Sequence, residues 1–194
     1  MKRATLSNIA SISTGLAYRG AEADLAVGDA YYVSFREVAE DAPVDWESCL
    51  RITPPTKREP DWLRDGDILM PSRGAKPFAA LVSQPPEHVC ASGPFLIIRP
   101  EQSAVSPRYL TWYLNRPAAQ ARLLRGAEGS AIKRVSAKML GSVEIPLPPL
   151  ARQHVFADIA ANNLAQRRNL TEQLANSYQH DAALARALEQ GTLA

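Results

Sequence analysis

The feature that most constrains the fold is a proline-rich stretch, Ile145 to Gln153, which precedes a long segment free of helix breakers. Residues Met139 to Pro146 alternate apolar and polar side chains as a strand does, and the prolines that follow cannot continue it because they lack a backbone N–H. Pro149 suits the first turn of a helix, and no further proline or glycine occurs until Gly191. The sequence therefore predicts one helix from Leu150 to Gln190, roughly 60 Å long at 1.5 Å per residue.

Apolar side chains recur along this helix at spacings of three and four, which is typical of a coiled coil or an antiparallel helix pair. The seam consists of Phe156, Ile159, Asn163, Gln166, Leu170, Leu174, Tyr178, Ala182, Ala185 and Leu188. Polar residues at seam positions weaken pairing but can define its register. We expect an exposed helix for dimerisation or docking. The alternative is an amphipathic helix that folds back on its own domain.

A chain of 194 residues is long enough for one domain with a substantial core and an appendage. No apolar run approaches the roughly 20 residues that span a bilayer, and Met1 to Gly20 lacks the apolar stretch of a signal peptide. We therefore expect a cytoplasmic protein. Cys49 and Cys90 lack the paired spacing of a zinc site, so we expect reduced thiols, no metal and no cofactor.

Short runs that favour strands recur before residue 100, with proline or glycine at nearly every junction. They are Tyr31–Phe35, Cys49–Ile52, Ile68–Met70, Ala79–Val82 and Phe95–Arg99. Helices are predicted only after residue 105. Ser106 is the expected N-cap of the first, with Pro107 in its first turn, and a second runs from Ala118 to Arg125. This pattern predicts a fold of the α+β class, with a β-rich domain, short helices and the long C-terminal helix.

The net charge of +2 conceals an uneven distribution along the chain. Residues Glu22 to Asp67 include 12 acidic and 5 basic side chains, whereas Ile68 to Lys138 include 10 basic and 3 acidic ones. A face with clustered Arg and Lys attracts the phosphate backbone of nucleic acids. The alternative is that folding interleaves the two blocks and leaves no patch.

The sequence contains no convincing catalytic constellation. Two of the three histidines fall on the predicted long helix, and neither a phosphate-binding loop nor a dinucleotide fingerprint occurs. Asp61, Asp65 and Asp67 raise the alternative of a metal-dependent nuclease, although carboxylates in turns beside a strand are usually solvated. We expect a binding protein rather than an enzyme.

The candidate DNA-binding residues lie mainly on two polar loops of the basic block, Pro71 to Lys76 and Gly129 to Arg134. Arginine can bind guanine O6 and N7 in the major groove, whereas lysine and serine mainly hold phosphates. The predicted set is Arg36, Arg73, Lys76, Ser130, Lys133 and Arg134.

Together these features resemble one half of the specificity subunit of a type I restriction-modification system. The resemblance rests on short motifs in a particular order and spacing. They are Leu-x-x-Ile-x-x-Ile-x-x-Gly from Leu6 to Gly15, Gly66 to Leu69, Pro107 to Leu110 with Tyr113 and Leu114, Gly129 with Ser130, and Ile145 to Leu150 with Gln153. The proline run before the long helix is the strongest of them.

The resemblance implies a target recognition domain, residues 1–147, that reads half of a split DNA site. A spacer helix, residues 148–194, would pair with its counterpart and dock the modification methyltransferase. Because the chain has one such unit, the resemblance implies a half-subunit that reads a split palindrome as a homodimer. The implied interface residues are Phe156, Ile159, Asn163, Gln166, Leu170, Leu174 and Tyr178.

Such a subunit is not catalytic and acts beside a methyltransferase and a restriction subunit. Where the family often has glutamate before Gln153, this chain has Arg152, which puts the local methyltransferase contact in doubt. The alternative from another class is a scaffold or anti-restriction protein that binds the methyltransferase through the helix without reading DNA.

Overall fold

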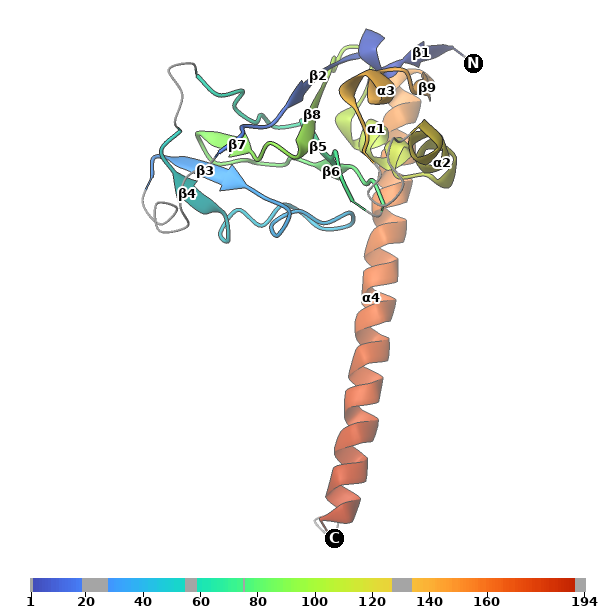
Figure 1. Cartoon of the computed structure of the whole chain (residues 1–194). Coiled ribbons are helices and arrows are strands. Elements are labelled where there is room, and N and C mark those ends of the chain that lie inside the picture. The colour runs from blue at the N-terminus through green and yellow to red at the C-terminus, as the bar shows by residue number, and fades with distance from the viewer. Residues whose placement is uncertain (1, 19–27, 55–58, 75, 127–133, 191–194) are drawn as a thin grey trace. The chain divides into compact units, whose positions relative to one another are not determined.

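The computed structural model describes residues 2–18, 28–54, 59–74, 76–126 and 134–190. The chain forms two compact units, Met1–Phe156 and Ala157–Ala194. The first holds the strands and short helices, and the second holds most of one long helix (Figure 1). None of the helices in the described segments combines the length and apolarity needed to cross a membrane.

The described strands of the N-terminal unit form three sheets. The strands are β1 (Arg3–Thr5), β2 (Ala10–Thr14), β3 (Ala30–Val33), β4 (Leu50–Ile52), β5 (Ile68–Pro71), β6 (Ala80–Leu81), β7 (Val89–Ala91), β8 (Phe95–Pro100) and β9 (Glu144–Pro146). The largest sheet has the order β2-β8-β5-β6 and is antiparallel throughout. In the second sheet β3 lies between antiparallel β4 and parallel β7, and β1 pairs with β9 in the third.

The core extends across the two larger sheets. Phe95 and Ile97 of β8 and Leu69 of β5 pack in one buried cluster with Val33 of β3 and Val89 of β7. Both central strands of the larger sheet are almost wholly buried, which explains their nearly continuous apolar sequences. The loops that leave β3 and β5 are therefore held by one shared core.

The opening motif has a structural explanation. Leu6 is fully buried in a short 3₁₀ turn, and its N–H donates to Val143 O at 2.9 Å. At the far end of the motif, Gly15 N–H donates to Phe95 O, and a Cβ atom there would lie 2.1 Å from Ser92 O. Only glycine permits this approach of two backbones.

The short helices gather at the end of the N-terminal unit opposite β3 and β4 (Figure 1). They are α1 (Pro107–Leu114), α2 (Pro117–Gly126) and α3 (Ala137–Gly141). Asn115 ends α1, and its side chain both accepts from Ala79 N–H at 2.7 Å and donates to Ala79 O at 2.8 Å. The Asn115 amide thus bonds to both backbone groups of Ala79, as a neighbouring strand would, and holds the end of α1 against the sheet at β6.

The structure confirms the predicted α+β class, and each of the five predicted strand runs contains a strand. The strands β1, β2 and β7 were not predicted. The predicted strand from Met139 is wrong in its first half, because the Ser136 hydroxyl accepts from Met139 N–H and starts α3. The predicted cap at Ser106 also differs, since its side chain forms no capping hydrogen bond.

The predicted strand Tyr31–Phe35 ends at Val33 instead. The carboxylate of Glu37 accepts from both the N–H and the hydroxyl of Ser34, at 2.8 and 2.7 Å, and the chain turns there. Phe35 and Arg36 thereby lie in a turn rather than in a sheet.

Arg99 on β8 joins segments that are distant in sequence. Its guanidinium donates to both carboxylate oxygens of Asp67, at 2.9 and 2.7 Å, to Asp61 at 2.9 Å, and to Trp62 O at 2.9 Å. Asp67 is 1% exposed, and Ser13 donates to the second oxygen of Asp61 at 2.6 Å. These bonds hold the turn before β5 against β8 and β2.

Burial by itself raises the pKa of Asp61, but the hydrogen bonds from Ser13 and Arg99, with the guanidinium charge, outweigh that effect. The pKa of Asp61 therefore lies below its ordinary value. The pKa of Arg99 is raised, chiefly by its hydrogen bonds to Asp67 and secondly by the bond to Asp61, which outweigh the opposing effect of burial.

Gln153 fixes the first turn of α4 (Leu150–Glu189) to the N-terminal unit. Its side chain is 1% exposed, accepts from Ser106 N–H at 2.8 Å and donates to Pro148 O and Ala104 O at 2.9 and 3.3 Å. The amide thus satisfies three backbone groups around the start of α1 and the proline run. This is a physical reason for a glutamine at this position.

The predicted long helix is confirmed as one continuous element of 40 residues. Its seam side chains Ile159, Leu170, Leu174, Tyr178 and Leu188 are all more than half exposed.

We expect Gln153→Leu to lower the free energy of unfolding by at least about 1–3 kcal/mol, because it leaves buried backbone groups without partners. Urea unfolding followed by circular dichroism measures this. The matched control is Gln173→Leu, the same change at an exposed site on α4, which should stay within about 0.5 kcal/mol of the wild type. Equal effects of the two substitutions would contradict the role of Gln153.

Asp61 should make the stability of the protein depend on pH. Because its folded pKa is lowered, its contribution is fully present above the ordinary value of about 3.9 and is lost as the pH falls through the folded pKa. We therefore expect the stability difference between wild type and Asp61→Asn to be largest near neutral pH and to shrink in acid. Urea unfolding over a pH series measures it, with the exposed Asp41→Asn as the control. A difference that stays constant into acid would contradict this.

Candidate nucleic-acid interface

Arg73 and Arg134, predicted on separate loops, lie directly opposite each other in an antiparallel β-bridge. Ser72 anchors this bridge, because its O accepts from Val135 N–H at 3.0 Å, and its N–H and hydroxyl both donate to Pro94 O at 2.8 and 2.6 Å. Both arginine side chains are exposed. The fold has thus brought two predicted DNA-binding residues together.

The pairing has an electrostatic consequence. Side chains directly opposite each other in an antiparallel pair lie on the same face, and like charges in that arrangement are unfavourable. Within the described residues, no carboxylate forms a salt bridge with either guanidinium. An anionic ligand would relieve this repulsion, and two guanidinium groups carried on opposed backbone positions suit phosphates or the O6 and N7 acceptors of guanine.

Lys76, on the same loop as Arg73, forms a salt bridge of 2.7 Å with Glu40. This contact ties the loop after β5 to the loop after β3. The positive charge of Lys76 is thereby partly compensated, so a DNA phosphate would have to compete with Glu40 for it.

Arg36 is exposed in the turn after β3, beside Phe35. Phe35 was predicted to lie in a strand. The signal that could have indicated the turn is Ser34-x-x-Glu37, the spacing at which a serine and a glutamate close a turn. The other two predicted residues, Ser130 and Lys133, lie outside the described residues.

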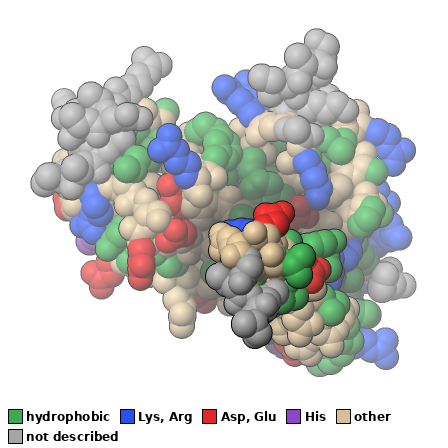
Figure 2. Space-filling view, turned by 90° about the horizontal axis from the view of Figure 1, so that it is seen from below, with side chains coloured by type: hydrophobic (Ala, Val, Ile, Leu, Met, Phe, Trp, Pro, Cys, Tyr) green, Lys and Arg blue, Asp and Glu red, His purple; other side chains and the backbone are tan. Residues whose placement is uncertain are grey.

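The two charge blocks are partly interleaved by folding. Arg99 and Lys76 of the basic block are paired with Asp61, Asp67 and Glu40 of the acidic block. On the face that Figure 2 draws, Lys and Arg side chains lie at the left and at the right, with Asp and Glu side chains mainly at the left and near the centre. Among the described residues, the candidate interface is therefore centred on the pair Arg73 and Arg134.

The acidic residues near β5 do not converge on a metal. Arg99 binds both Asp61 and Asp67, and Asp65 accepts from Gln84 N–H at 2.9 Å. In the part of the chain that the structure describes, no group of three or more His, Cys, Asp or Glu residues could hold a metal ion. The carboxylates thus have structural partners, and the nuclease alternative gains no support.

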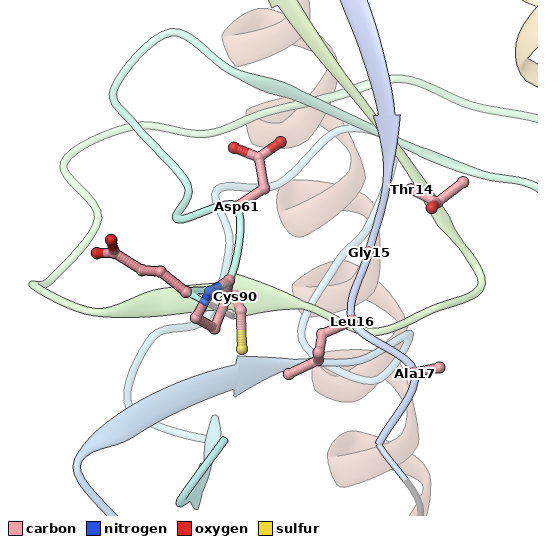
Figure 3. Close-up of a pocket in the computed structure, with 8 residues that line it drawn as sticks. Thr14, Gly15, Leu16, Ala17, Asp61 and Cys90 are labelled. Carbon is pink, nitrogen blue, oxygen red and sulfur yellow. The ribbon is translucent and has the colours of Figure 1, made fainter. Parts of the chain in front are cut away.

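A pocket of about 330 Å³ between β2 and β7 includes Asp61 and Cys90 in its lining (Figure 3). The Asp61 carboxylate and the Cys90 sulfur point away from each other. Burial raises the pKa of the Cys90 thiol to about 11, and burial with the nearby charges of Glu37 and Asp45 raises that of Cys49 to about 12. Neither thiol is activated as a nucleophile at neutral pH.

One of the predicted interface residues on α4 has a partner within the N-terminal unit. The Phe156 ring stacks on Trp112 of α1, with centroids 6.0 Å apart and planes 6° from parallel, and it also contacts Tyr109. The Arg116 guanidinium also lies over the Trp112 ring, 5.3 Å from its centroid. Phe156 therefore forms an aromatic cluster with Trp112 and Tyr109 near the N-terminal end of α4.

Several solved structures share this fold, among them the following three. The HsdS subunit from Thermoanaerobacter tengcongensis superposes with a TM-score of 0.67 at 20% identity over 94% of this chain. A chain from a structural study of complex assembly and conformational transition of the type I R-M system superposes with a TM-score of 0.63, at 18% identity over 98% of this chain. The type I restriction-modification system S subunit from M. genitalium superposes with a TM-score of 0.55, at 15% identity over 92% of this chain. This chain covers 46%, 44% and 44% of those chains, less than half of each.

No curated protein matches the sequence. A family model does match it, over residues 66–177, which is more than half of the chain and runs from the turn before β5 into α4. The model describes the type I restriction modification DNA specificity domain, a family of non-catalytic recognition subunits. The expected family and the expected absence of an enzymatic role agree with this match. The chain belongs to the type I restriction-modification DNA specificity family.

Proposed function

We propose that this chain is a half-subunit that reads one half of a split DNA site for a type I restriction-modification system. The observation that carries the proposal is the Arg73–Arg134 bridge. Two exposed guanidinium groups on opposed backbone positions, in a family of DNA specificity domains, favour a polyanionic ligand with acceptor groups in a fixed geometry.

The recognition unit would be the loops around this bridge. Arg73 and Arg134 would contact the duplex directly, and Arg36 would reach it from the turn after β3. The salt bridge between Lys76 and Glu40 supports this arrangement, because it ties the two loops together before DNA arrives. Ser130 and Lys133 remain proposed phosphate contacts. Residues 1–147 would serve recognition.

Residues 148–194 would serve assembly. The exposed seam of α4 would pair with the same seam of a second copy, burying side chains such as Leu174 and Tyr178, which are 57% and 67% exposed in the single chain. A twofold dimer would present two identical recognition units and would read a split palindrome. The polar seam residues Asn163 and Gln166 would define the register.

The same helix, together with the proline run, would dock the modification methyltransferase. The exposed Arg152 would sit at that contact in place of the glutamate that relatives often have.

The direct test is selection from a randomised duplex pool at near-physiological salt, because binding at low salt reports phosphate contacts alone. We expect an enriched split palindrome. Failure to enrich any sequence, with or without a cognate methyltransferase, would contradict the proposal. Binding of the methyltransferase without DNA would support the scaffold alternative.

Replacing Arg73 or Arg134 with Ala should weaken binding to the selected duplex by about 1–3 kcal/mol and should relax the sequence preference at one base position. Lys133→Ala should weaken binding to all sequences alike and reduce the dependence on salt concentration. Fluorescence anisotropy titrations at several salt concentrations measure both effects. The matched control is Arg168→Ala, an exposed arginine on α4. Unchanged affinity in the three site variants would refute the assignment.

Leu174→Asp should convert the dimer into a monomer. Each fully buried leucine contributes about 1.5–3 kcal/mol to association. Because a twofold interface contains the substituted residue twice, the dissociation constant of the dimer should increase on the order of a hundredfold or more. Sedimentation equilibrium measures it. Asn176→Asp introduces the same charge at an exposed position outside the seam and should leave the dimer intact. A monomeric wild type would rule out the proposed interface.

A further inference from the structure

Phe35 is an apolar side chain in an unusual setting. It lies in the turn from Ser34 to Glu37 and is 44% exposed, although it belongs to a loop rich in charge. The turn is held from inside by the Glu37 carboxylate, which is itself 6% exposed and accepts from the N–H and the hydroxyl of Ser34. The position of Phe35 is thus defined before any ligand binds.

The Phe35 ring packs against the core on its inner side. It contacts the Phe95 ring, with centroids 4.8 Å apart and planes at 51°, and Phe95 is fully buried. The interior beneath Phe35 is therefore already filled. The remaining part of the ring stays exposed in the free protein.

Phe35 lies in the neighbourhood of the paired arginines. Phe95, on which it packs, is the residue opposite Pro71 in the pairing of β8 with β5, and Arg73 follows Pro71 by two residues. Arg36 is the next residue in the turn. An anionic ligand held by Arg36 and Arg73 would meet the exposed part of the Phe35 ring.

We infer that Phe35 determines specificity by contacting the C5 methyl group of a thymine in the major groove. This inference rests on the proposed function. A phenyl ring cannot hydrogen-bond to base edges, and the thymine methyl is the apolar group that those edges offer in the major groove. A wedge between base pairs would need the whole ring to be free, whereas the Phe35 ring already contacts the Phe95 ring.

The test replaces each thymine of the selected duplex, one at a time, with uracil, which removes only the methyl group. For the wild type, one replacement should lower affinity about fourfold, the factor expected for one buried methyl group. Phe35→Ala should bind the thymine duplex more weakly and should no longer distinguish uracil at that position. Phe35→Leu, which keeps an apolar side chain, should retain part of the discrimination.

Two controls separate this inference from the proposed function. Arg73→Ala should bind more weakly but keep its preference for thymine, and urea unfolding should show that Phe35→Ala is folded. The inference alone would be overturned if binding of the duplex depends on Arg73 but Phe35→Ala responds to every uracil replacement as the wild type does. Failure to select any sequence would overturn both.

Discussion

The guanidinium of Arg99 joins parts of the N-terminal unit that are distant in sequence, and the position of the candidate recognition loop follows from that junction. By binding Asp67 through both carboxylate oxygens, it holds the turn before β5 against β8. From that turn β5 runs directly to Ser72 and Arg73. This partly buried group of charges is stable because each carboxylate and the guanidinium have several hydrogen-bond partners, and the loss of Arg99 would leave the buried Asp67 uncompensated.

The candidate interface illustrates how a rigid sheet can present groups that repel each other. Arg73 and Arg134 would separate in a flexible loop, because two exposed positive charges avoid each other. Backbone hydrogen bonds of Ser72 with Pro94 and Val135 keep them opposed. The repulsion is then present in the free protein, and an anion bound there would relieve it, which is why we propose a polyanion as the ligand. Glu37 acts similarly on Phe35, by holding an apolar side chain at the surface.

Local patterns predicted the elements well where a single residue type has one dominant effect. The prolines before Leu150 ended the strand and started α4, and the apolar runs at Ile68 and Phe95 became central strands. The pattern failed where a side chain bonded to the backbone. Ser136 began a helix within a predicted strand, and Glu37 ended another strand two residues early. Such bonds depend on one hydroxyl or carboxylate and leave little trace in hydrophobic periodicity.

The sequence by itself determined the division into a β-rich domain and a long helix, because the distribution of proline, glycine and apolar residues acts over short distances along the chain. It also indicated which loops carry positive charge. Only the tertiary structure decided which charges remain available. It paired Arg99 and Lys76 with carboxylates from the acidic block, and it set Arg73 against Arg134 and Phe35 on Phe95. These are contacts between residues distant in sequence, and they arise when the sheets close around a shared core, which no local pattern encodes.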